Sequence, residues 1–184
     1  GTIANTEAAG TPGATTCMNC HLGGTFNPTT TIDIKNSAGT SVTTVQSDSV
    51  YDVSVTIVAA SGTPGAYGFQ AIFLENQNNT NIGTFQNLGT GQTTKTFANG
   101  RVAVEHNTPS TSNSFSFKWK APNVATATTA TLYAFAMAVN LNSNGTGDIG
   151  DGHTYQVTVQ PSLPSGIAQT VSGVEMTLFP NPVV

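Results

Sequence analysis

The stretch Y-D-V-S-V-T-I, residues 51–57, alternates large apolar side chains with polar ones. A period of two residues is typical of a β-strand with one buried and one wet face, because successive side chains point to opposite sides of a sheet. The stretch F-S-F-K-W-K, residues 115–120, repeats the pattern with aromatic side chains. Both stretches therefore predict half-buried strands that contribute to one core.

The same signal continues through much of the chain. Further strands are expected at residues 67–75, 102–106, 132–139 and 155–160. Turns are expected at the clusters of Gly and Asn between the strands, which are residues 60–65, 76–79, 98–100 and 142–152. No segment has a convincing helical spacing. The pattern predicts an all-β fold, an immunoglobulin-like β-sandwich or a related topology, with extended N- and C-terminal arms.

Three regions are expected within the 184 residues, which suit one globular domain with tails. Residues 1–28 are rich in Gly, Thr, Ala and Pro and are expected to form an extended arm around a turn at Cys17 to His21. Residues 29–160 are expected to form the β-sandwich. Residues 161–184 are expected to form a linker followed by a last strand.

The composition narrows the choice of partners. Five Lys and Arg stand against nine scattered Asp and Glu, so neither nucleic acid nor an anionic membrane is favoured. No stretch of about 18 apolar residues predicts a transmembrane segment. The polar surface is expected to consist of Thr, Ser, Asn and Gln, which suits a secreted protein, and Gly1 is expected to be a mature N-terminus.

The segment Cys17-Met18-Asn19-Cys20-His21 has the form C-x-x-C-H. Two thiols at this spacing can add to the vinyl groups of one porphyrin, and the next imidazole can ligate the iron. The motif predicts one covalent haem c, with Cys17 and Cys20 as attachment residues and His21 as the proximal ligand. A disulfide or redox pair, a zinc site and a chance match are the alternatives.

A second iron ligand has to come from elsewhere in the chain. His106 extends an apolar strand face and is the candidate distal ligand, with a core or rim histidine as the alternative. His153, in a loop rich in Gly and Asp, is the second candidate. Met137 is expected to be a core residue, and Met176 is a further possible donor. Two histidines would hold the reduction potential below that of a histidine and methionine pair.

Other chemistry has weaker signals. Residues 142–151 include Asp148 and Asp151, but a polar turn is expected in place of a calcium site because the EF-hand pattern and its bidentate Glu are missing. No nucleophile triad, paired-carboxylate pocket or phosphate loop indicates a hydrolytic enzyme. Peroxidase-like activity stays open, with His106 or Glu105 as the distal acid–base group.

Several segments together resemble a known family. They are G-T-P-G at residues 10–13, Y-G-F-Q at 67–70, V-E-H-N-T at 104–108, F-K-W-K-A-P at 117–122, and the stretch 140–151. These segments resemble the bacterial reelin-domain-like, choice-of-anchor V secreted proteins over roughly Thr11 to Gln160. The resemblance implies a reelin-like sandwich exported to the cell surface and, through its E-H-x-T match, His106 as a haem ligand.

Two further segments resemble export and modification signals. Residues 178–183, L-F-P-N-P-V, are similar to the opening of the C-terminal sorting domain of type IX secretion substrates in Bacteroidota. Asp48-Ser49-Val50 is similar to the O-glycosylation triplet of that phylum. Both imply a protein that reaches the cell surface.

These signals predict an extracellular single-haem cytochrome that carries one electron at a time and is not an enzyme. A structural or adhesive cell-surface module with a stabilising or sensory haem is the alternative. The two extended arms could each add a strand to a neighbour's sheet, so a homo-oligomer or a filament with haems in series is expected. The redox partner is not indicated.

Overall fold

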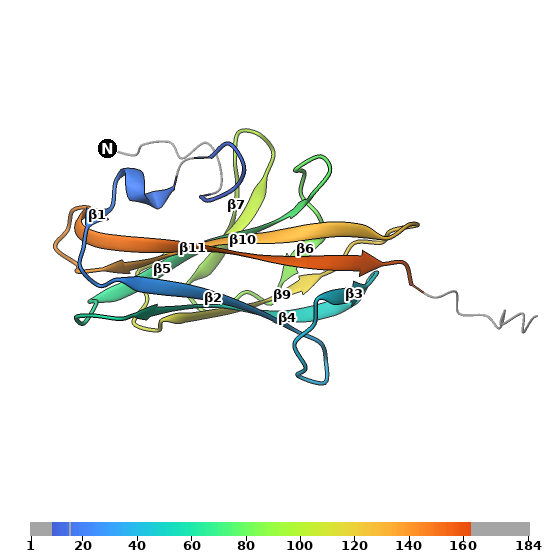
Figure 1. Ribbon diagram of the computed structural model, residues 1–184, viewed down its shortest axis with the longest axis horizontal. Coiled ribbons are helices and arrows are strands. Elements are labelled where there is room, and N and C mark those ends of the chain that lie inside the picture. Colours follow the sequence, from blue (N-terminus) through green and yellow to red (C-terminus); the bar gives the residue numbers. More distant parts are fainter. Residues whose placement is uncertain (1–8, 15, 163–184) are drawn as a thin grey trace, which may run out of the picture.

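The computed structural model describes residues 9–14 and 16–162, which form two β-sheets packed face to face (Figure 1). Within this part of the chain there is no α-helix, and Cys17–Asn19 form a 3-10 helix, η1. The strands are β1 (Leu22–Gly23), β2 (Pro28–Lys35), β3 (Thr44–Gln46), β4 (Val50–Ala59), β5 (Ala66–Glu75), β6 (Thr84–Gln86), β7 (Gln92–Thr96), β8 (Val102–His106), β9 (Ser114–Lys120), β10 (Thr128–Val139) and β11 (Thr146–Gln160). The predicted all-β sandwich is confirmed.

The two sheets differ in size. The larger, seven-stranded sheet has the order β1-β11-β10-β5-β8-β7, with β3 also paired to β11, and the four-stranded sheet has the order β2-β4-β9-β6. The long strand β11 pairs in parallel with β1 near its beginning and with β3 at its end. It therefore ties both the N-terminal strand β1 and the short strand β3 to the larger sheet.

The alternating stretches that predicted strands supply the core between the sheets. On β4 and β9 the buried residues are Tyr51, Val53, Val55, Ile57, Phe115, Phe117 and Trp119. Trp119 is fully buried and stacks on Phe73, with ring centroids 4.0 Å apart. Its indole Nε1 donates a hydrogen bond to the carbonyl of Ile82 at 3.0 Å, so the one polar atom of this side chain is satisfied.

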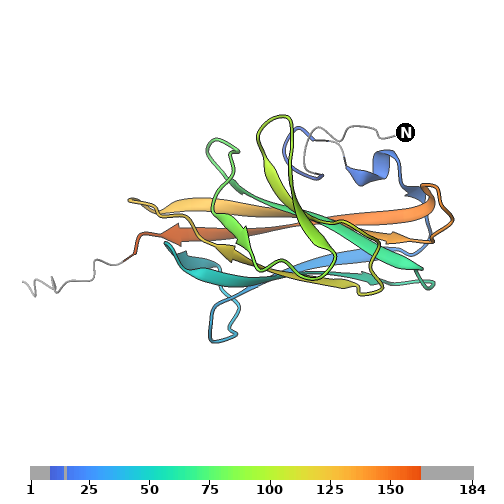
Figure 2. The same cartoon turned by 180° about the vertical axis from the view of Figure 1, so that it is seen from behind.

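Strand β10 contributes to both faces of the larger sheet. Its small side chains and Leu132 face the core between the sheets, whereas Phe135 and Met137 form a separate cluster with Ala9. The backbone N–H of Ala9 donates to Oε1 of the buried Gln70 at 2.6 Å. Residues 9–14 and η1 therefore lie over the outer face of this sheet, as both views show (Figures 1 and 2).

The turn expected at residues 142–152 is wrong in extent, because β11 already begins at Thr146. The glycines that suggested a turn lie opposite large side chains, since Gly150 pairs with Met137 and Gly152 with Phe135. A Cβ at Gly150 would overlap the sulfur of Met137, and one at Gly152 would lie 3.0 Å from the Phe135 ring. Both glycines are strand residues. Because they have no side chain, they leave space for Met137 and Phe135 on the outer face of the larger sheet.

The arms are only partly described. The last strand expected near residue 176, Met176 itself and the sorting-type segment all lie outside the described residues. Residues 22–23 of the N-terminal arm belong to the larger sheet through β1. No helix in the described residues is long and apolar enough to span a membrane. The division at residues 28 and 160 stays a prediction.

Candidate functional site: a cavity beneath the C-x-x-C-H turn

The C-x-x-C-H segment forms a tight turn that is anchored to the larger sheet. The N–H groups of Cys20 and His21 both donate to the carbonyl of Cys17, at 3.2 and 3.0 Å. Beyond the turn, Leu22 N–H donates to the carbonyl of Gly145 at 2.9 Å. A Cβ at Gly145 would overlap the carbonyl oxygen of Cys20, so only glycine lets the turn approach this closely.

A cavity of about 420 Å³ lies beneath this turn. Cys17, His21 and His106 line it together, although they are far apart in the sequence. Its other walls include the apolar side chains of Met137, Val139 and Leu141. The volume lies within the range of about 300–1,000 Å³ that is typical of small-molecule sites.

The structure therefore brings together three of the four predicted site residues. Cys20 is exposed at the end of the turn and does not line the cavity. His153 is exposed, lies in β11 opposite Ala134 instead of in a loop, and does not line the cavity. Met137 is buried, as expected, and forms part of the cavity wall.

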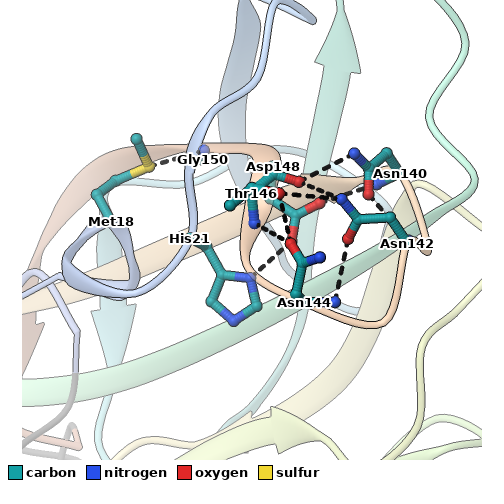
Figure 3. A network of polar contacts seen from close by, with 8 residues as sticks. All are labelled: Met18, His21, Asn140, Asn142, Asn144, Thr146, Asp148 and Gly150. Atoms are coloured by element: carbon teal, nitrogen blue, oxygen red, sulfur yellow. Dashed lines mark hydrogen bonds and ion pairs between the residues drawn. The ribbon is translucent and has the colours of Figure 1, made fainter.

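His21 is held by a buried carboxylate. Its Nδ1 lies 2.8 Å from Oδ2 of Asp148, whose side chain is 3% exposed. The other oxygen, Oδ1, accepts the N–H of Asn140 at 2.9 Å. Since a carboxylate accepts hydrogen bonds, Nδ1 of His21 is the donor, and its other ring nitrogen points away from the loop (Figure 3).

The loop that precedes Asp148, between β10 and β11, is built from asparagine turns. The side-chain oxygens of Asn140, Asn142 and Asn144 each accept the backbone N–H two residues further on, at 3.0, 3.1 and 2.7 Å (Figure 3). Side chains of this kind replace backbone partners in turns. The oxygen-rich stretch therefore uses these three oxygens to shape its own backbone.

His106 ends β8 and packs against β5. Its Nδ1 lies 2.9 Å from the carbonyl oxygen and 3.0 Å from the N–H nitrogen of Phe69. A Cβ at Gly68 would lie 2.6 Å from Nε2 of the ring, so the absence of a side chain there makes the space for the imidazole. Neither Gly68 nor the Phe69 backbone was predicted as part of the site.

Cys17 and Met18 anchor the turn on its apolar side. Both side chains pack against the cluster of Ala9, Phe135 and Met137. Burial is the largest effect on the Cys17 thiol and raises its pKa to about 11. The sulfur of Met18 accepts the N–H of Gly150 at 3.1 Å (Figure 3). The turn is thus fixed by apolar contacts as well as by hydrogen bonds.

A c-type haem is held by cysteine thioethers and a proximal imidazole, and a second donor, an imidazole or a thioether, can complete the iron. Cys17, His21 and His106 lie at the cavity, and Cys20 belongs to the same turn but lies outside the cavity lining. Within the described residues no three His, Cys, Asp or Glu side chains are grouped to hold a metal ion. A haem iron needs fewer protein ligands, because the porphyrin supplies its equatorial nitrogens. Both histidines have Nδ1 beside an acceptor, which is the arrangement that presents Nε2 to a metal. The residues present therefore fit this group.

Comparison with known proteins concerns the sandwich rather than the cavity. The family described as Reeler domain matches residues 16–141. The human F-spondin reeler domain is 20% identical, with 77% of this chain and 91% of that chain covered and a TM-score of 0.45. A cohesin module from a Clostridium perfringens family 33 glycoside hydrolase is 14% identical, with coverage of 74% and 99% and a TM-score of 0.46. No curated protein matches the chain.

The two thiols are expected to react at different rates in the haem-free chain. At pH about 8, iodoacetamide should modify the exposed Cys20 first, because a pKa of about 11 leaves Cys17 almost wholly protonated and only the thiolate is nucleophilic. Tandem mass spectrometry of the peptide that contains both residues gives the two rates. In urea the rates should converge, and equal rates in the folded chain would contradict the burial of Cys17.

Proposed function

This chain belongs to the Reeler domain family, and we propose that it carries one covalent haem c and transfers single electrons outside the cell. A fold can serve many functions, so the proposal rests on the site. The observation that carries it is the single cavity lined by Cys17, His21 and His106. His21 follows directly on a pair of thiols with the haem-attachment spacing.

Each residue has a separate task in this proposal. Cys17 and Cys20 would form the thioethers that tether the haem, and Nε2 of His21 and of His106 would hold its iron. When bound, the haem supplies a one-electron couple between ferric and ferrous iron. Two imidazoles favour the ferric state more than a methionine would. Asp148 adds to this effect, since an acceptor at Nδ1 makes an imidazole a stronger donor at Nε2.

The rim of the cavity offers a route for electron exchange. Leu141 lines the cavity and is 56% exposed, and Leu22, in β1 beside the turn, is 53% exposed. Contiguous exposed apolar surface can mark a contact site. A redox partner could therefore approach the haem edge at this rim. Export to the cell surface and the sorting-type C-terminus belong to the same proposal.

Haem attachment is expected to depend on both cysteines. The variant Cys17→Ala with Cys20→Ala should contain no covalent haem, whereas Cys17→Ala alone should keep one thioether and shift the pyridine haemochrome band. Denaturing mass spectrometry reports the covalent haem directly. Asn19→Ala is the matched control, because it lies in the same turn and leaves both thiols and the imidazole in place. Full haem content in the double variant would refute the assignment.

The distal ligand is expected to be His106 and not His153. His106→Ala should convert a low-spin ferric spectrum to a high-spin one, because the cavity loses an imidazole. His153→Ala should leave the spectrum unchanged, since that side chain lies outside the cavity. A high-spin wild-type spectrum would favour the alternative, a structural or adhesive module with a stabilising or sensory haem. The opposite response of the two variants would transfer the role to His153.

Assembly into a homo-oligomer or filament is part of the proposed function. Strand β7 is an edge of the larger sheet and β6 an edge of the smaller one, and a free edge can accept a strand from a second copy. Repeated copies would place haems in series.

Deleting residues 1–8 or 163–184 is expected to reduce the assembly to monomers, because each deletion removes an arm that could be donated. Light scattering and electron microscopy of native and truncated chains measure this. Residues 9–14 are kept in the first deletion, since Ala9 is docked on the chain's own sheet. A full-length chain that is monomeric at all concentrations would reject the filament.

A further inference from the structure

The imidazole of His106 lies beside Phe69 of β5, in the position that a hydrogen-bonded neighbouring strand would otherwise occupy. The N–H and C=O of Tyr67 bond to Ser110, at 2.7 and 2.9 Å. The same groups of Phe69 point to the same side, because alternate residues of a strand share a direction. The regular pairing of β5 with β8 ends at Gln70 and Glu105. Nδ1 of His106 therefore meets both polar backbone groups of Phe69.

In any one tautomer, Nδ1 of His106 can hydrogen-bond to the N–H or to the carbonyl of Phe69, but not to both. With a proton on Nδ1, the ring donates to the Phe69 carbonyl at 2.9 Å and leaves Nε2 bare. With the proton on Nε2, Nδ1 accepts the Phe69 N–H at 3.0 Å. Each tautomer of His106 thus gains one hydrogen bond and leaves one backbone group of Phe69 without this partner.

For His21, the contact at Nδ1 supports one tautomer only. Its Nδ1 faces a carboxylate oxygen of Asp148, which can only accept. The second oxygen of Asp148 already accepts from Asn140. The tautomer with the proton on Nδ1 is the one that this contact supports, and it is the tautomer that presents a bare Nε2.

We propose that His21 is a permanent axial ligand and that His106 is an exchangeable one, which opens the distal position to small uncharged ligands. The inference rests on the proposed function. In the exchange, the bond from His106 Nε2 to iron is replaced by a bond from the lone pair of the incoming ligand, and no electron is transferred. In the released ring the Nδ1 proton passes through water to Nε2, so that the hydrogen bond to the Phe69 carbonyl is lost and Nδ1 accepts the Phe69 N–H instead. Uncharged ligands are favoured because Asp148 lines the cavity.

The first test needs no haem. In the chain produced without haem and labelled with ¹⁵N-histidine, the ring nitrogen shifts report the tautomers. His21 should show the Nδ1–H form alone. His106 should show both forms in measurable amounts, because each gains one hydrogen bond to Phe69. A single tautomer at His106 would overturn the proposal.

Asp148→Asn provides a variant of the same shape. Its amide oxygen can accept the Asn140 N–H, which places the amide NH₂ against His21 and favours the wrong tautomer of that ring. His21 should then switch to the Nε2–H form, while the mixture at His106 stays unchanged. An unchanged His21 would overturn the role given to Asp148.

The second test uses carbon monoxide on the dithionite-reduced, haem-loaded chain. The wild type should bind it, and His106→Ala should bind it about tenfold more tightly or better, because no internal ligand has to leave. A haem-loaded wild type that does not bind carbon monoxide, or equal affinities, would overturn the exchange. If the chain takes up no haem, the proposed function is rejected as well. The tautomers in the haem-free chain then distinguish this failure from a failure of the exchange proposal alone.

Discussion

Burying a carboxylate is costly unless its oxygens meet donors, and Asp148 shows how the chain satisfies this constraint. One oxygen accepts from His21 and the other from the backbone of Asn140. The carbonyl of Asp148 also accepts the N–H of Gly24 at 3.0 Å. The same residue therefore holds the C-x-x-C-H turn through its side chain and through its backbone. The asparagine turns before it shape the loop around this one charge.

The alternation of side chains was sufficient to predict the sandwich, because its core strands bury one face each. Strands β6 and β7 lacked this signal, since they are short or polar and lie at sheet edges. The beginning of β11 was misread for a different reason. Gly150 and Gly152 look like turn residues, but they face Met137 and Phe135 across the sheet. Composition alone cannot distinguish a glycine that bends the chain from one that makes room for a neighbour.

The site was predictable where its parts are local in sequence. Cys17, Cys20 and His21 belong to one turn. His106 was reached from its place on an apolar strand face and from a family resemblance, and it lines the same cavity as Cys17 and His21. The support for the histidines was not predictable. Asp148 is 127 residues from His21, and Phe69 acts through its backbone, which carries no side-chain signal. Gly68 contributes by having no side chain at all.

The separation of 127 residues between His21 and Asp148 also bears on how the chain matures. Contacts between distant segments form late in folding, because the loop between them must close first. The N-terminal turn therefore stays without its partner until β11 has joined the sheet. During that interval both thiols are exposed, and the finished sheet later shields Cys17. The long sequence separation between His21 and Asp148 thus delays the shielding of Cys17 until the larger sheet is complete.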